Sequence, residues 1–190
     1  YYTGITWGPD SKRIYLYNLN RDQNHLRLCC FDASTGTMEK VLYEETHPKY
    51  VEPEHDIVFL PWDNDKFIYW SEKDGYERLY LYSLKEGKTL RKLTDERLGV
   101  VLELLGFNVK TRSVIVNATG TQPMQHNLFS VGIEKDAVKL LGEAKGVHSG
   151  KLSADGTLLV DDWSAPDVPH RIDLVNTSNG KTQTLLDAEN

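Results

Sequence analysis

Short apolar stretches whose side chains alternate with a period of two recur along the whole chain. Clear examples lie at residues 13–17, 66–70, 78–82 and 113–116. This period places successive side chains on opposite faces of a β-strand. No long stretch has helical spacing, and the best helical candidate, residues 96–105, contains Gly99 and two adjacent valines, so we expect a strand there. The pattern predicts an all-β fold.

Turn-forming residues between these stretches recur in two series. The first occupies residues 8–11, 62–65, 108–111 and 153–156, and the second occupies residues 34–36, 85–87, 134–136 and 177–180. Both repeat at intervals of roughly 50 residues, the interval typical of four-stranded propeller blades. The sequence therefore predicts a β-propeller fragment of about four blades, each with four antiparallel strands.

The predicted blade-like units span residues 1–46, 47–97, 98–146 and 147–190. Four blades can close a ring, and they can equally form half of a larger one. A β-sandwich with regular turns is the alternative for the same pattern.

Composition and charge narrow the class of partner. Ten Tyr and four Trp suit strands, and the formal net charge of −6 argues against nucleic acid, which needs a basic face. No segment has the roughly 20 apolar residues needed to span a bilayer. No targeting signal is visible, and the start at Tyr1, inside an expected strand, indicates a piece cut from a longer chain.

Cys29 and Cys30 are adjacent. In a strand their thiols point to opposite faces, so we expect no bond between them, with one in the core and the other on the opposite face of the sheet.

Motifs for catalysis are absent from the sequence. The Gly-x-Ser-x-Gly motif of a serine hydrolase does not occur, and the nearest imitation, His148-Ser149-Gly150, precedes an expected inner strand. Neighbours in sequence do not make a catalytic triad, whose members must meet in space. We therefore predict no catalytic residue in this chain.

Metal and phosphate motifs are equally weak. Glu52, Glu54, His55 and Asp56 cluster in an expected loop between blades, where a solvated surface is the simpler interpretation. The pair Asp161 and Asp162 lacks the framework of a calcium loop. The glycines occur singly, mostly in turns, so we predict no metal and no cofactor.

Residues 67–82 resemble a blade of the dipeptidyl peptidase IV family. Ser71, Asp74, Gly75 and Tyr76 match that family's Ser-x-x-(Asp/Glu)-Gly-aromatic turn, and Leu79-Tyr80 match the strand that follows. Arg78 stands where the family often has His.

The resemblance extends over nearly the whole chain. An earlier blade is matched by the opening, residues 5–8 through 31–32. Further along, residues 92–94 resemble the family's blade-closing strand. Pro123 with residues 127–129 resembles its Pro…Asn-Leu-aromatic segment, and residues 146–156 resemble its link into the next blade.

The resemblance implies a fold and a role. The family pairs an eight-bladed N-terminal propeller with a C-terminal α/β-hydrolase domain, whose Ser, Asp and His release N-terminal Xaa-Pro or Xaa-Ala dipeptides. This chain resembles roughly the second half of that propeller. Its partner would be the peptide substrate of the hydrolase domain, its location periplasmic or secreted at the cell envelope, and a homodimer of the whole protein is compatible with the family.

Some features of the family are missing from this chain. No match occurs to the paired acidic residues that hold the substrate's free amine. Some members of the family close the hairpin after their first Cys with a disulfide to a second Cys, and no such Cys occurs near residues 38–40 of this chain. The loop that corresponds to the family's cavity-facing link contains Tyr50, Val51 and Glu52, ahead of Pro53. We expect these three to face the substrate cavity, and a purely structural link with an aromatic plug is the alternative.

Three functions remain open at this point. The chain is the non-catalytic propeller portion of a serine exopeptidase, or a free-standing propeller that binds or scaffolds, or a small hydrolase that uses scattered His and Asp residues. The strand-like start and the family turns favour the first, and the missing nucleophile motif counts against the third. Cut from a larger ring, such a fragment would expose sheet edges that invite pairing between copies.

Overall fold

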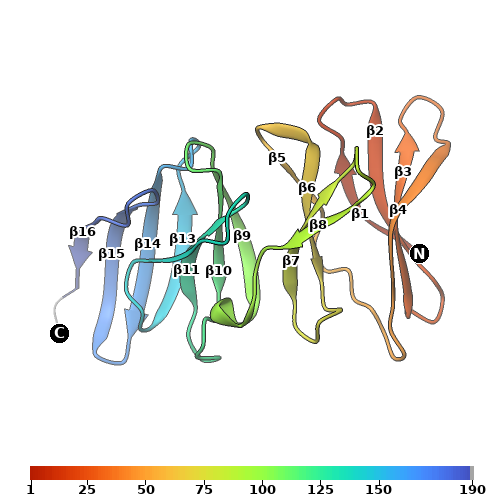
Figure 1. Cartoon of the computed structure of the whole chain (residues 1–190). Helices are drawn as coiled ribbons and strands as arrows, with labels where there is room; N and C mark the ends of the chain where they lie inside the picture. The colour runs from red at the N-terminus through yellow and green to blue at the C-terminus, as the bar shows by residue number, and fades with distance from the viewer. Residues whose placement is uncertain (189–190) are drawn as a thin grey trace. The chain divides into compact units, whose positions relative to one another are not determined.

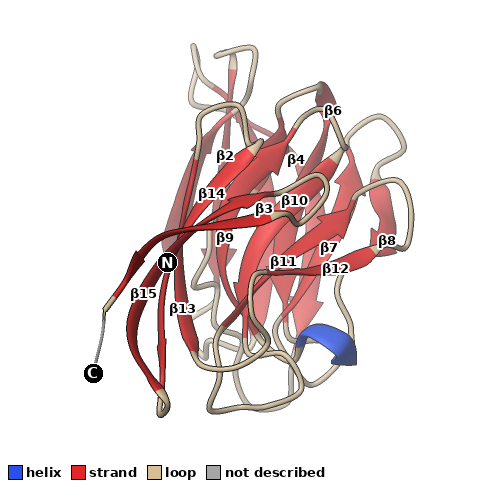
Figure 2. Ribbon diagram, turned by 90° about the vertical axis from the view of Figure 1, so that its left-hand side faces the viewer, coloured by secondary structure: helices blue, strands red, loops and turns tan. Residues whose placement is uncertain are grey.

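A computed structural model of the protein describes residues 1–188. These residues form sixteen β-strands and one short 3₁₀ helix (Figures 1 and 2). The strands make four antiparallel four-stranded sheets, in each of which neighbours in sequence are neighbours in the sheet. The all-β prediction is therefore confirmed, and each sheet has the strand order of a propeller blade.

The chain divides into two compact units. The first spans Tyr1–Lys92 and the second begins at Leu93. Each unit contains two sheets. The finer division into four blade-like units at residues 46, 97 and 146 stays a prediction.

The first unit contains eight strands in two sheets. One sheet comprises β1 (Tyr2–Trp7), β2 (Arg13–Leu19), β3 (His25–Asp32) and β4 (Met38–Thr46). The other comprises β5 (Val58–Leu60), β6 (Asp63–Ser71), β7 (Arg78–Ser83) and β8 (Lys88–Lys92).

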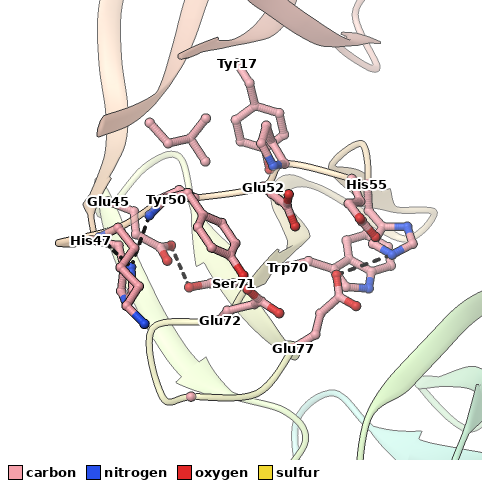
Figure 3. Close-up of a pocket in the computed structure, with 16 residues that line it drawn as sticks. Tyr17, Glu45, His47, Tyr50, Glu52, His55, Trp70, Ser71, Glu72 and Glu77 are labelled. Carbon is pink, nitrogen blue, oxygen red and sulfur yellow. Dashed lines mark hydrogen bonds and ion pairs between the residues drawn. The ribbon is translucent and has the colours of Figure 1, made fainter. Parts of the chain in front are cut away.

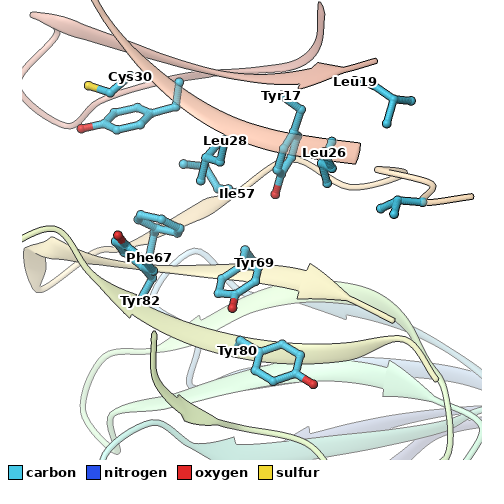
Figure 4. Close-up of a cluster of buried hydrophobic side chains, with 12 residues drawn as sticks. Tyr17, Leu19, Leu26, Leu28, Cys30, Ile57, Phe67, Tyr69, Tyr80 and Tyr82 are labelled. Atoms are coloured by element: carbon cyan, nitrogen blue, oxygen red, sulfur yellow. The ribbon is translucent and has the colours of Figure 1, made fainter. Parts of the chain in front are cut away.

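Aromatic residues fill the core between the two sheets of the first unit (Figure 4). Along β2, Tyr15, Tyr17 and Leu19 are buried while the residues between them are half-exposed, as a period of two requires. Phe67 stacks on Tyr82 with ring centroids 4.9 Å apart. All six residues of β7 are buried, so this strand is covered on both of its faces.

The second unit repeats the arrangement. One sheet comprises β9 (Val101–Asn108), β10 (Ser113–Ala118), β11 (Asn127–Gly132) and β12 (Val138–Leu141). The other comprises β13 (Val147–Leu152), β14 (Leu158–Ala165), β15 (Val168–Asn176) and β16 (Thr182–Asp187). One core cluster of this unit is aliphatic and contains Ile115, Leu128, Leu141, Leu159 and Val175.

Two local predictions were wrong. The turn expected at residues 62–65 lies earlier, because Leu60 pairs with Asp63 and β6 already begins there. The strand expected over 96–105 begins only at Val101. Before it, Glu96–Leu98 forms a 3₁₀ turn, η1, in which the Asp95 side chain accepts a hydrogen bond from the backbone N–H of Arg97.

The two cysteines are free and both are buried. Cys30 belongs to the aromatic core, whereas Cys29 does not. The expectation that they do not bond to each other is confirmed, and burial raises the pKa of both thiols.

Candidate functional site

A cavity of about 230 Å³ in the first unit contains the three predicted cavity residues (Figure 3). One wall is the link between β4 and β5, which includes Tyr50, Val51 and Glu52. The opposite wall is the hairpin between β6 and β7, represented by Ser71, Glu72, Gly75 and Glu77. Two segments that are distant in sequence thus enclose one pocket.

The link is anchored by its middle residue. Val51 is only 8% exposed and packs in the aromatic core, and its backbone N–H donates a 2.8 Å hydrogen bond to the carbonyl of Gln23. Upstream, the ring Nδ1 of His47 accepts hydrogen bonds from the backbone N–H groups of Lys49 and Tyr50. These contacts fix the course of the link.

The flanking residues of the anchor face the cavity. The Tyr50 side chain is 53% exposed and extends toward Ser71 and Glu72 on the opposite wall (Figure 3). Glu52 is exposed and lines the same cavity. All three predicted residues are therefore brought together, Val51 as the buried anchor and the other two as surface groups.

The hairpin wall is held by its own polar contacts. Ser71 donates a 2.6 Å hydrogen bond to Glu45, at the end of β4. The ammonium of Lys73 lies 3.9 Å from the centre of the Tyr80 ring and donates a 3.2 Å hydrogen bond to the Tyr69 hydroxyl. Burial lowers the pKa of Lys73. The hairpin is thus tied both to β4 and to the aromatic core.

Aromatic rings and carboxylates share the far end of the cavity. The rings of His55 and Trp70 stack with centroids 4.7 Å apart, and His55 Nε2 lies 3.3 Å from a carboxyl oxygen of Glu77. The buried indole N–H of Trp70 has no hydrogen-bond partner within residues 1–188.

The cavity is strongly acidic. Five glutamates line it, Glu45, Glu52, Glu54, Glu72 and Glu77, against the single lysine Lys49. Burial, together with the neighbouring carboxylates of Glu54 and Glu72, raises the pKa of Glu77 to about 7. A cationic group that entered the cavity would relieve this repulsion.

Sequence reasoning missed most of this site. It interpreted the cluster of Glu52, Glu54, His55 and Asp56 as a solvated loop rather than a metal site, and so did not identify Glu54 and His55 as cavity residues. It also recognised the hairpin motif around Ser71 only as a turn. The missing signal was the approach of the hairpin to the link, which no local pattern contains.

The imitation motif in the second unit does not form a Ser–His pair. His148 is buried on one face of β13, whereas Ser149 is exposed on the other. Of the sequence pair Asp161 and Asp162, Asp162 has a carboxyl oxygen 2.9 Å from Nε2 of the exposed His170.

The sequence pattern of the family described as "Dipeptidyl peptidase IV (DPP IV) N-terminal region" matches residues 1–170. The chain belongs to this family. The match covers most of both units, so the recognition made from the blade turns is confirmed.

Curated relatives agree with this membership. A probable dipeptidyl-aminopeptidase B from Arthroderma gypseum is 23% identical over 190 residues, which cover 94% of this chain and 21% of the relative. A second, from Trichophyton verrucosum, is 21% identical over 194 residues, with 96% and 22% covered. The chain thus spans about a fifth of the length of these relatives.

Solved structures confirm the fold. A structure from Bacteroides ovatus that carries the name of a dipeptidyl aminopeptidase IV has a TM-score of 0.90 and 42% identity, covering 100% of this chain and 29% of that one. Dipeptidyl peptidase 4 of Porphyromonas gingivalis has a TM-score of 0.81 at 20% identity, covering 96% and 26%. The four sheets are therefore four-stranded propeller blades of the DPP IV type.

The described residues contain no helix long and apolar enough to cross a membrane.

Proposed function

We propose that this chain is the non-catalytic propeller portion of a DPP IV-like serine exopeptidase. In this proposal the propeller portion forms one wall of the substrate cavity and controls the access of peptides to a separate α/β-hydrolase domain. That domain releases N-terminal Xaa-Pro or Xaa-Ala dipeptides. A periplasmic or secreted location and a homodimer of the whole protein belong to the same proposal and are drawn from the family alone.

The observation that carries the proposal is the cavity between the link and the hairpin. It presents the exposed ring of Tyr50 and the carboxylate of Glu52 on one side and the hairpin carboxylates on the other. A largely preformed concave site with a few convergent polar groups is typical of ligand binding. Contacts of this kind hold a peptide in register while the chemistry takes place elsewhere.

The acidic lining also predicts which peptides are preferred. Five carboxylates against one lysine favour a peptide with a basic side chain in its N-terminal part over one with an acidic side chain. Stems of Lys and Arg pack on aromatic faces, which Tyr50 and the His55–Trp70 stack supply here.

The test uses the longer protein that carries this chain. Tyr50→Ala should raise KM for an Xaa-Pro peptide roughly five- to tenfold with little change in kcat, because it removes a binding surface and no reacting group. The matched control is Tyr76→Ala, since Tyr76 is 60% exposed on the hairpin but does not line the cavity. Equal effects of the two substitutions, or an unchanged KM, would contradict the proposal.

A second experiment addresses selectivity. Glu52→Gln should lower the ratio of kcat/KM between a lysine-containing and a glutamate-containing peptide several-fold. Glu134→Gln changes the same functional group on an exposed turn of the second unit and should leave the ratio unchanged. A ratio that stays constant in both variants would show that Glu52 does not contact the peptide.

One observation favours the alternative of a free-standing binding module. All 16 residues that line the cavity come from the first unit, so the pocket exists without any residue from another domain. If this chain by itself binds peptides, with Trp70 fluorescence as the readout, while the longer protein cleaves none, the binding module becomes the better function.

A further inference from the structure

His148 lies at the start of β13 and is surrounded by hydrogen-bond acceptors. Its side chain is fully buried, and its Nδ1 lies 2.9 Å from both carboxyl oxygens of Asp161 on β14. Its other ring nitrogen, Nε2, lies 3.0 Å from the backbone carbonyl oxygen of Lys145. Above the ring, Trp163 stacks at 5.1 Å between centroids and 13° between planes.

A carbonyl oxygen only accepts hydrogen bonds, so Nε2 must carry a hydrogen. The second hydrogen lies either on Nδ1 or on Asp161. Because Nδ1 is equidistant from both oxygens of the carboxylate, an N–H shared by the two oxygens fits the geometry, whereas a hydroxyl on one oxygen would favour that oxygen alone. Both ring nitrogens then carry a hydrogen.

We propose that His148 is an imidazolium ion in the folded protein and acts as a pH-sensitive latch, which fastens the link between β12 and β13 to the edge of the β13–β16 sheet. The positive charge is held by Asp161 on the sheet side, and the proton on Nε2 holds the Lys145 carbonyl on the link side. Loss of one proton leaves a ring lone pair facing an acceptor, so the latch opens.

The link is also held by other contacts. Asn127 donates hydrogen bonds to the carbonyls of Glu143 and Ala144, and the Lys145 ammonium contacts Asp167 at 2.5 Å on the exposed surface. The backbone of His126 donates to the Gly146 carbonyl at 3.3 Å and accepts from the His148 N–H at 3.0 Å. None of these contacts involves the Lys145 carbonyl, so the His148 ring adds a separate bond between the link and the sheet.

The charged groups around the ring favour the ion. Asp173 on β15 is 3% exposed, pairs across the ladder with Asp161 and accepts a 2.8 Å hydrogen bond from the Trp163 indole. The other titratable or charged groups on the surrounding elements are Glu143 and Lys145 on the link, Lys151 on β13, Asp162 on β14, His170 and Arg171 on β15, and His126 before β11. Arg171 lies on the far side of Trp163, its guanidinium 6.0 Å from that ring.

Burial by itself lowers the pKa of His148, but the hydrogen bond to Asp161 and the charge of that carboxylate, together with the Lys145 carbonyl, outweigh it and raise the pKa. Burial also raises the pKa of Asp161, so the two groups compete for one proton, which the two equal Nδ1–oxygen distances place on the ring. The same contacts exclude a role for His148 as a catalytic base, because neither nitrogen offers a lone pair to a substrate.

The test is a ¹H–¹⁵N NMR titration of the imidazole nitrogens in the 190-residue chain. Signals of His148 are assigned by their loss in His148→Gln. We expect both nitrogens to carry a hydrogen at pH 7.5, where a free imidazole with a pKa near 6.5 is mostly neutral. Above the pH at which His148 titrates, amide exchange of His126 and His148, whose N–H groups bond to Gly146 and His126, should accelerate at least tenfold after correction for its intrinsic pH dependence.

The matched control is His170→Gln, which removes a histidine with the same 2.9 Å carboxylate contact, in the same sheet but 45% exposed. It should leave the His148 signals and the exchange of both amides unchanged. An Nδ1 without hydrogen at pH 6 to 7.5, or exchange of these amides that ignores the His148 titration, would overturn the proposal. If His148→Gln folds poorly, nuclear Overhauser contacts to the stacked Trp163 ring assign the His148 signals, and both readouts still come from the wild-type chain.

Discussion

The Ser71 hydroxyl donates a 2.6 Å hydrogen bond to the Glu45 carboxylate, and this contact joins the end of β6 to the end of β4 at the wall of the cavity. Ser71 is 6% exposed and Glu45 is half-exposed, so the bond is partly buried. The same carboxylate also accepts from the Tyr43 hydroxyl. One glutamate thus holds the hairpin wall against the neighbouring sheet.

Ser71→Ala should therefore lower the free energy of unfolding of the first unit by about 1–2 kcal/mol, because it removes a partly buried hydrogen bond to a charged group. The control is Ser34→Ala, which removes a bond of the same type and length, 2.6 Å to Asp32, on an exposed turn. The control should cost clearly less, because water replaces the lost bond at an exposed site. Urea unfolding followed by tryptophan fluorescence measures both, and equal losses would show that burial of the Ser71 bond adds nothing.

The strand content could be predicted from the sequence because sheets impose a local period. Tyr15, Tyr17 and Leu19 alternate with half-exposed residues, and this alternation is present in the sequence. The alternation of residues 78–82 likewise identified β7 as a strand, although all six residues of that strand are buried in the structure. The turn at residues 62–65 was predicted because Asp63 and Asn64 are typical turn residues. In the structure the turn is complete within the two residues between Leu60 and Asp63, so Asp63 and Asn64 already belong to β6.

The candidate site was predictable only in part. The link residues Tyr50, Val51 and Glu52 were identified through the family resemblance, which carries information about distant contacts. Glu72 and Glu77 were missed, because a turn between two strands contains no record of the segment that it faces across a cavity. The excess of carboxylates becomes visible only when the link and the hairpin are placed together.

The protonation of Glu77 should make stability depend on pH near neutrality. Its side chain is 17% exposed, and its pKa is raised from the ordinary 4.5 to about 7. The folded state therefore binds more protons than the unfolded state in this range, and the free energy of unfolding should fall as pH rises from about 4.5 to about 7.

Glu77→Gln should abolish this part of the pH dependence and stabilise the chain above pH 7 relative to the wild type. Glu86→Gln alters an exposed turn glutamate and should leave the slope unchanged. Urea midpoints at a series of pH values test the pair, and a wild-type slope that persists in Glu77→Gln would assign it to another group.

A glycine in the second unit tests the packing of its turn. Gly156 has φ +73°, and a Cβ there would lie 1.8 Å from the backbone carbonyl oxygen of Phe107. Gly156→Ala should therefore cost clearly more than the roughly 1–2 kcal/mol of a left-handed backbone alone. Gly180→Ala, at φ +76° but facing only the flexible end of Lys139, should cost about that smaller amount. Thermal unfolding of both variants gives the comparison, and equal shifts in Tm would show that the Phe107 contact relaxes freely.

The outer face of the β1–β4 sheet predicts association of this chain with a second copy. Cross-strand pairing aligns Trp7, Ile14, Phe31 and Met38 in one apolar row across all four strands. Trp7 is 58% exposed and Met38 47%, and burying such a row against another apolar sheet is favourable. Sedimentation velocity should show the mean mass rising with concentration, and Trp7→Lys should shift the species toward monomer. Tyr76→Lys, at an equally exposed aromatic on the cavity hairpin, should not. A compact monomer at millimolar concentration would show that this face does not mediate association.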